Sequence, residues 1–123
     1  MSPWTADDLR TIADTTDLFV SPFREDGTSY GTPTRVWALV VNGQVYARAA
    51  NGVQSSWYQA AVSQRAGRVR VADRIYDVTF APADADVNEA IDAAYEAKYP
   101  GSPAVATMQA AGPSAATVKV TLT

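Results

Sequence analysis

Apolar residues recur along this chain with two spacings, one typical of helices and one typical of strands. The N-terminal segment TADDLRTIADTTD begins with a capping-box pattern, Thr5 and Asp8, and it places Leu9, Ile12 and Ala13 on one helical face. This spacing predicts a first helix. SSWYQAAVSQRAG predicts a second, capped by serine and closed by Gly67.

A third helix is predicted in DADVNEAIDAAYEAKYPG, where Asp86 and Glu89 form another capping-box pattern ahead of apolar residues at helical spacing. The acidic residues of this segment lie largely opposite its apolar stripe. They therefore indicate a solvated helix face, and we expect neither carboxylate-pair catalysis nor a metal site there.

Strand patterns fill most of the remaining chain. RVWALVV, residues 35–41, is apolar nearly throughout, as a central strand covered on both faces would be. Asn42-Gly43 then predicts a tight hairpin into QVYARAA. LFVSPF, the alternating segment RVRVADRIYDVTFAPA with its turn near residues 72–74, and the C-terminal TVKVTLT predict further strands. The result is an α+β fold with a small antiparallel barrel of about six strands and three flanking helices.

The size and composition of the chain limit the classes of function. Its 123 residues, 47% of them hydrophobic and 19% charged, fit a single domain spanning residues 1–123. The absence of cysteine excludes disulfides and thiolate nucleophiles, and the absence of histidine removes the usual general base. Neither a signal-peptide pattern nor an apolar run of roughly 18 residues is present, so we expect a cytoplasmic protein with no membrane contact.

Charge is unevenly distributed along the sequence. The net charge of -3 argues against a nucleic-acid-binding surface. Residues 35–74, however, contain six arginines and one acidic residue, Asp73. As a set these arginines indicate an anionic ligand, whereas a solvated sheet face explains any one of them equally well. Arg68 and Arg70 alternate with valines, so we expect both on the solvent face of an edge strand rather than in a site.

The run TRVWALVVNGQVYARAANGVQSSWYQAAVSQRAGRVRVADRIYDVTF resembles the split β-barrel flavin-binding proteins. It is similar in particular to the deazaflavin-dependent nitroreductase-like group, which has the pyridoxamine 5'-phosphate oxidase-like fold, and to a related bacterial family of unknown function. The similarity lies in the NGQVY hairpin, the WY helix start and the RAGRVRV strand, and AAYEAKYPG resembles a further stretch of that group. It implies a split β-barrel with FMN or a deazaflavin coenzyme in a groove between the subunits of a homodimer.

The resemblance also implies hydride transfer to or from a small organic molecule, and it places cofactor-binding residues by position. Thr34 and Arg35 would begin the cofactor-facing strand, and Arg48 would end its hairpin partner. The remaining predicted contacts are Asn51, Gly52, Trp57 and Tyr58. No catalytic residue is assigned, because the flavin would supply the redox chemistry.

Physical reasoning supports this placement and also leaves alternatives open. Gly52 would let the backbone approach a planar ring, and a helix beginning near Ser55 would offer free N–H groups to an anion. Arg48, beside this loop, could grip a phosphate or carboxylate with two N–H groups. Equally, Trp57 could be a packing residue, and Asn51-Gly52 only a turn between strand and helix.

Acidic residues disfavour one of the two cofactors. Glu25 and Asp26 lie where the nitroreductase-like group has a basic turn, so a polyanionic coenzyme tail would be repelled. FMN, another ligand or an empty pocket then remain. The alternative function is a cofactor-free binding protein, or a non-redox enzyme such as an isomerase or cyclase. Its pocket would be lined by aromatic residues, namely Trp37, Tyr46, Trp57 and Tyr58. A dimeric scaffold without a ligand is a third reading.

Overall fold

The computed structural model describes residues 4–15 and 17–123. Within these residues the chain forms one antiparallel sheet of seven strands, in the order β2-β1-β5-β6-β7-β4-β3. The strands are β1 (Leu18–Pro22), β2 (Thr34–Val36), β3 (Ala38–Val41), β4 (Gln44–Arg48), β5 (Ala66–Val71), β6 (Arg74–Pro82) and β7 (Thr117–Leu122).

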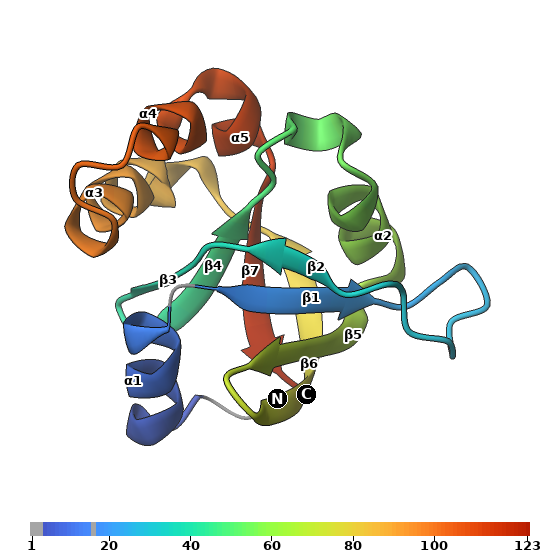
Figure 1. The fold of residues 1–123 in the computed structure, drawn as a ribbon. Helices are drawn as coiled ribbons and strands as arrows, with labels where there is room; N and C mark the ends of the chain where they lie inside the picture. The colour runs from blue at the N-terminus through green and yellow to red at the C-terminus, as the bar shows by residue number, and fades with distance from the viewer. Residues whose placement is uncertain (1–3, 16) are drawn as a thin grey trace.

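The sheet curls into a nearly closed barrel (Figure 1). Its two outermost strands, β2 and β3, are consecutive in the chain and are separated only by Trp37. The two edges of the sheet must therefore approach each other at Trp37. The predicted α+β antiparallel barrel is confirmed. The prediction of one central strand over residues 35–41 is wrong, because Trp37 divides this run between the two edges, and the sheet accordingly has seven strands rather than about six.

Helices surround the barrel on several sides (Figure 1). In the described residues there are five α-helices rather than the three predicted, with two short 3₁₀ helices. The helices are α1 (Ala6–Asp14), α2 (Ser56–Gln64), α3 (Asn88–Lys98), α4 (Ala104–Gln109) and α5 (Ala111–Ala115), with η1 (Gly52–Gln54) and η2 (Ala85–Val87). Helices α4 and α5 were not predicted.

Two apolar clusters hold these elements together. The larger one fills the barrel interior with buried valines of β1, β5, β6 and β7, and Ile12 of α1 and Ala61 of α2 pack against it. The smaller one lies between the β3–β4 hairpin and helices α3 and α4, and it contains Leu39, Tyr46 and Ile91. Because β4 contributes to both clusters, its alternate residues face the interior and the helices.

Turn and cap chemistry explains several element ends. Asn42 and Gly43 both have positive φ, 51° and 75°, as the predicted β3–β4 hairpin requires. Thr5 caps α1 as predicted, since its hydroxyl accepts a hydrogen bond of 3.1 Å from the Asp8 N–H. The Asp86 cap is wrong: η2 precedes α3, and the N-cap residue is Val87.

The prediction that Gly67 ends α2 is also wrong. The helix ends at Gln64, and Arg65 adopts the left-handed conformation with φ 63°. Gly67 lies instead in β5 opposite Pro22 of β1, where a Cβ would stand 2.5 Å from the Ser21 carbonyl oxygen. The glycine is required for close strand packing. Among the described helices, none has the length and apolar character needed to cross a bilayer.

Candidate functional site

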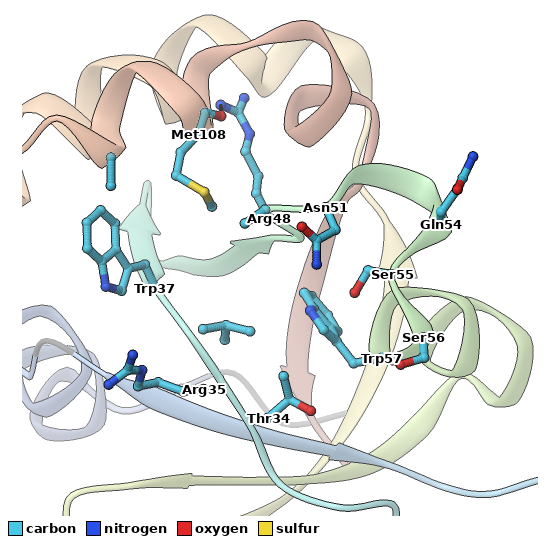
Figure 2. Close-up of a pocket in the computed structure, with 13 residues that line it drawn as sticks. Thr34, Arg35, Trp37, Arg48, Asn51, Gln54, Ser55, Ser56, Trp57 and Met108 are labelled. Atoms are coloured by element: carbon cyan, nitrogen blue, oxygen red, sulfur yellow. Dashed lines mark hydrogen bonds between the residues drawn. The ribbon is translucent and has the colours of Figure 1, made fainter.

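A cavity of about 790 Å³ opens where β2, the turn after β4, the start of α2 and helix α4 come together (Figure 2). The sheet topology determines where this cavity lies. Trp37, where the two edges of the sheet approach each other, is one of its lining residues. The lining residues are Thr34, Arg35, Val36, Trp37, Arg48, Ala50, Asn51, Gln54, Ser55, Ser56, Trp57, Ala104 and Met108.

Two tryptophans provide the aromatic surface of this cavity. In Figure 2 Trp37 and Trp57 lie on two sides of it. Trp57, in the first turn of α2, is only 7% exposed and also packs against the barrel interior. The Trp37 ring stacks on Tyr99, with 3.9 Å between ring centroids and 13° between planes. Both indoles are therefore held in place by the protein, which fixes the spacing between the two aromatic surfaces.

A layer of polar groups behind Trp37 keeps it in place. The Tyr95 hydroxyl donates a hydrogen bond of 3.4 Å to the Trp37 carbonyl oxygen. Lys98 donates to the carbonyl oxygens of Ala38, at 2.6 Å, and of Ile12, at 2.9 Å. Burial raises the pKa of Tyr95 above its ordinary value and lowers the pKa of Lys98 to about 8. At neutral pH the tyrosine is protonated and the lysine still carries most of its charge.

Arg48 is buried between β4 and the helices that cover it, with 1% of its surface exposed. Its guanidinium group lies 5.6 Å from the centre of the Tyr95 ring. All five of its N–H donors have protein partners. These are the Thr117 hydroxyl at 3.0 Å, the Asp92 carboxylate at 2.5 Å, the Met108 carbonyl at 3.0 Å, the Asn88 carbonyl at 3.3 Å and the Asn88 side-chain oxygen at 3.2 Å.

These contacts tie Arg48 to α3 and α4, because Asn88 and Asp92 belong to α3 and Met108 to α4. The contact of Arg48 with a cofactor therefore stays a prediction, and the donors that it would need are occupied by the protein. In this structure Arg48 forms part of the wall of the cavity, and it donates a hydrogen bond to the backbone carbonyl of Met108, which also lines it.

Arg35 lines the same cavity but, unlike Arg48, is largely exposed. It lies on the edge strand β2, and its side chain is 69% exposed. Among the described residues its one ion pair is with Asp17, whose carboxylate lies 4.0 Å from the Arg35 Nε. Such an exposed pair is weak, so the guanidinium group remains able to bind an anion. Thr34 precedes it, and its hydroxyl donates a hydrogen bond of 3.3 Å to the Thr32 carbonyl.

The N-terminus of α2 adds a positive end of a helix dipole to the rim. Ser55 is the N-cap residue, as predicted, but within the described chain its side chain makes no capping hydrogen bond. The N–H groups of the first turn are thus not covered by that hydroxyl. Asn51, at the end of the turn after β4, also lines the cavity, and Figure 2 shows its side chain near Trp57.

The structure brings most of the predicted cofactor-binding residues to one place and leaves two elsewhere. Those that line the cavity are Thr34, Arg35, Arg48, Asn51 and Trp57. Gly52 has φ 73° and faces α5, where a Cβ would stand 3.5 Å from the Gly112 carbonyl oxygen. Tyr58 packs against the barrel interior. Neither belongs to the lining residues.

Helix α4 supplies two lining residues that sequence reasoning missed, Ala104 and Met108. A signal was present, since Pro103 precedes the helix and Val105 and Met108 are apolar residues three positions apart. Tyr46, expected in the lining of a cofactor-free pocket, lies instead in the cluster beneath α3 and α4.

Fold and cavity together define a class of protein: an antiparallel α+β barrel with a tryptophan-lined cavity at its rim. The chain belongs to a bacterial family, DUF2255, described as an uncharacterized protein conserved in bacteria, which matches residues 8–120. This confirms the resemblance to a bacterial family of unknown function. The comparison with curated proteins gives no match.

A solved structure of similar fold is that of the FAD and heme binding protein from Mycobacterium smegmatis. The two share 14% sequence identity with a TM-score of 0.59, and the alignment covers 98% of this chain. It covers 66% of the mycobacterial chain, so this protein spans about two thirds of that length. At this identity the likeness establishes a shared fold.

Proposed function

We propose that the tryptophan-lined cavity binds a flavin and that the protein is a flavin- or deazaflavin-dependent oxidoreductase acting on a small organic molecule. The observation that carries the proposal is the pairing of two immobilised indoles, Trp37 and Trp57, with an anion-attracting rim in a cavity of about 790 Å³. The fold similarity to a protein that binds FAD and heme supports the same ligand class.

The chemistry of the lining fits a flavin in two respects. An isoalloxazine ring is flat and largely apolar, and indole rings favour stacked or edge-on contact with such rings. The phosphate is an anion, for which the N-terminus of α2 and the exposed guanidinium group of Arg35 are suitable partners. A bound flavin would supply the hydride-transfer chemistry, while the protein residues orient the ring and exclude water from it.

The neighbourhood of α2 favours FMN over a coenzyme with a longer anionic tail. A second cavity, of about 650 Å³, shares Ser56 with the first and is lined by Glu25 and Asp26. Hydrogen bonds from Ser29 and Thr28 lower the pKa of Asp26 to about 2, so this carboxylate is ionised at neutral pH. A polyanionic tail that continued from Ser56 along α2 would meet this negative charge. We therefore expect FMN to bind more tightly than a deazaflavin coenzyme.

A second copy of the chain completes the site in this proposal. Arg35 is mostly exposed on β2, and β2 is an edge strand of the sheet. Edge strands offer unpaired backbone groups to a partner. We propose a homodimer whose partner covers the open side of the cavity. Sedimentation analysis tests this: a dimer that becomes tighter with FMN would support it, and a monomer in the presence of saturating FMN would contradict it.

One observation favours a different function. Arg48 is the more deeply buried arginine at the cavity, and its N–H donors bind protein acceptors. Among the described lining residues, Arg35 is then the cationic side chain that could contact a phosphate. A cofactor-free protein that binds a small apolar molecule, or a non-redox enzyme of the isomerase or cyclase type, would need no more than this.

A titration followed by absorbance and fluorescence separates the two functions. The wild-type protein is titrated with FMN, FAD and the deazaflavin coenzyme, alongside Arg35→Gln and Arg10→Gln. Arg10 lies on α1, is 70% exposed and provides a control with the same loss of charge. We expect FMN binding in about the micromolar range, weakened about tenfold in Arg35→Gln by loss of a charge-assisted contact, and unchanged in Arg10→Gln. Failure of all three ligands to bind would overturn the flavin proposal in favour of the cofactor-free one.

A further inference from the structure

A smaller cavity, of about 290 Å³, lies on the outer face of the sheet beneath the loop that joins β1 to β2. It shares no lining residue with the tryptophan-lined cavity. Arg68 and Arg70 of β5 form one side of it, and Tyr30 of the covering loop forms another. The expectation that β5 is an edge strand is wrong, since it pairs with β1 and β6. Arg68 therefore points from the middle of the sheet rather than from a free edge.

Arg68 has no polar partner among the described residues. Its guanidinium group stacks over the Tyr30 ring, with Cζ 3.9 Å from the ring centre. In the part of the chain that the structure describes, its Nε is the one buried side-chain nitrogen or oxygen atom without a hydrogen bond. A buried donor without an acceptor is costly, and native structures rarely keep one unless something else binds it.

Ser21 provides a second, independent donor at the same place. It is paired with Arg68 across β1 and β5, it lines the cavity, and only 7% of its surface is exposed. Among the hydrogen bonds of the described residues none involves its hydroxyl group. Two neighbouring strands thus each place an unpaired donor beside one small cavity.

The remaining lining residues indicate the charge and shape of a ligand. No acidic residue is among the described residues that line the cavity. The cross-strand neighbour of Arg68 on β6 is Asp77, which accepts a hydrogen bond of 3.1 Å from the Tyr30 hydroxyl. Apolar surface comes from Phe19 and from Ile75, which is 58% exposed. The cavity therefore combines cationic donors with an apolar wall.

We propose that this cavity binds a small carboxylic acid with an apolar body. Arg68 lines the cavity, and the described residues supply no acceptor for its Nη–H groups, which can donate in parallel to the two oxygens of a carboxylate. The Ser21 hydroxyl donates to the same group, and the apolar body lies against Phe19 and Ile75. Because the two cavities share no residue, a ligand bound here does not displace one bound between Trp37 and Trp57.

The test uses benzoate as the probe, titrated into the ¹⁵N-labelled full-length protein, with binding read from chemical-shift changes. Four proteins are compared: wild type, Arg68→Gln, Ser21→Ala and the charge-matched control Arg10→Gln. We expect benzoate to bind the wild type saturably. Its affinity should fall about tenfold or more in Arg68→Gln and severalfold in Ser21→Ala, and it should be unchanged in Arg10→Gln. Retained backbone spectra identify the variants that remain folded. A fifth protein, Arg68→Lys, keeps the positive charge but loses the paired N–H donors of the guanidinium group, and we expect it to bind benzoate more weakly than the wild type.

Three results would overturn the proposal. The first is a titration in which benzoate does not saturate the wild type. The second is equal weakening in Arg10→Gln and Arg68→Gln, which would show that net charge alone attracts the probe. The third is a protein that does not bind benzoate but self-associates through this face, so that Ile75→Asp dissociates it. FMN binding by Arg68→Gln is measured in parallel, because the two cavities are independent and either proposal can fail alone.

Discussion

Arg48 and Arg68 occupy similar positions in the sheet and have opposite surroundings. Each extends from the outer face of a strand, and each lies near a tyrosine ring, Tyr95 for Arg48 and Tyr30 for Arg68. Arg48 has acceptors for all of its donors, whereas the buried Nε of Arg68 has none among the described residues.

The difference follows from what covers each strand. Helices α3 and α4 cover β4, and their carbonyl, amide and carboxylate groups compensate the burial of Arg48. Over β5 the cover is a loop, and it presents to Arg68 the face of an aromatic ring. An arginine whose N–H donors all have protein acceptors stabilises the fold. An arginine without such acceptors keeps donors that a ligand can use. Three sets of variants test this contrast, and a fourth prediction concerns another arginine, Arg74.

The largest effect is expected from Arg48→Met, which keeps an unbranched side chain of similar reach and removes every polar contact. It leaves Asp92, Asn88 and Thr117 without their partner, so we expect the free energy of unfolding to fall by about 3–5 kcal/mol. Urea denaturation measures it. Arg68→Met is the matched variant, and we expect no loss of stability from it, because it removes a buried donor that has no acceptor among the described residues. Equal losses in both would contradict the contrast.

Gly67→Ala tests whether the strands beneath Arg68 are rigid although Arg68 itself is unpaired. The new Cβ would stand 2.5 Å from the Ser21 carbonyl oxygen and 2.6 Å from Pro22 Cα. Because both are backbone atoms, the strands must separate, and we expect a loss of about 2–3 kcal/mol. Gly112→Ala, where a Cβ meets nothing within 4 Å, is the control and should be tolerated. A fully stable Gly67→Ala protein would show that β1 and β5 can move apart.

Asp92→Asn removes one partner of Arg48 and keeps the others. The Asp92 side chain is 38% exposed, so solvent screens the interaction, and we expect a loss of only about 1 kcal/mol. Combining it with Arg48→Met should add almost nothing, because the partner has already gone. If the two losses simply added in the double variant, Asp92 would act independently of Arg48.

A smaller effect, dependent on pH, is expected at a third arginine. Arg74 forms ion pairs with Asp7 at 2.9 Å and Asp8 at 3.4 Å, and the Tyr76 hydroxyl donates a 2.6 Å hydrogen bond to Asp8. The Tyr76 hydrogen bond is the main cause that lowers the pKa of Asp8 below 3.8.

The folded protein therefore favours ionised Asp8, and this stabilisation is present above pH 3.8 and is lost as the pH falls through the lower folded-state pKa. Tyr76→Phe should reduce the fall in Tm between neutral pH and about pH 3. Thr79→Val, a change elsewhere on β6, is the control. An identical fall in Tyr76→Phe and wild type would remove Asp8 from the acid response.

Local patterns predicted the barrel, its β3–β4 hairpin and three of its helices, because strand alternation, Asn42-Gly43 and helical spacing act over a few residues. They did not predict the division of residues 35–41 at Trp37, which is imposed when the two edges of the sheet meet. Helices α4 and α5 are short and rich in alanine, so their stability depends on packing against α3 and η1 rather than on a strong apolar periodicity.

The candidate site was predictable as a neighbourhood rather than atom by atom. The resemblance to the split β-barrel proteins placed Thr34, Arg35, Asn51 and Trp57 at one site, and all four line the cavity. The roles of Arg48 and Arg68 could not be read in the same way. Both alternate with apolar residues along a strand, and only the tertiary structure shows that helices cover one and a loop covers the other.

The most direct test of the flavin proposal uses the three tryptophans. Trp37 and Trp57 line the large cavity, whereas the Trp4 indole N–H donates a 2.9 Å hydrogen bond to the Val120 carbonyl oxygen and does not line it. In a ¹⁵N–¹H spectrum of the protein titrated with FMN, we predict saturable shifts of the Trp37 and Trp57 indole signals and an unmoved Trp4 signal. Unmoved Trp37 and Trp57 signals at saturating FMN would contradict a flavin site between these two indoles.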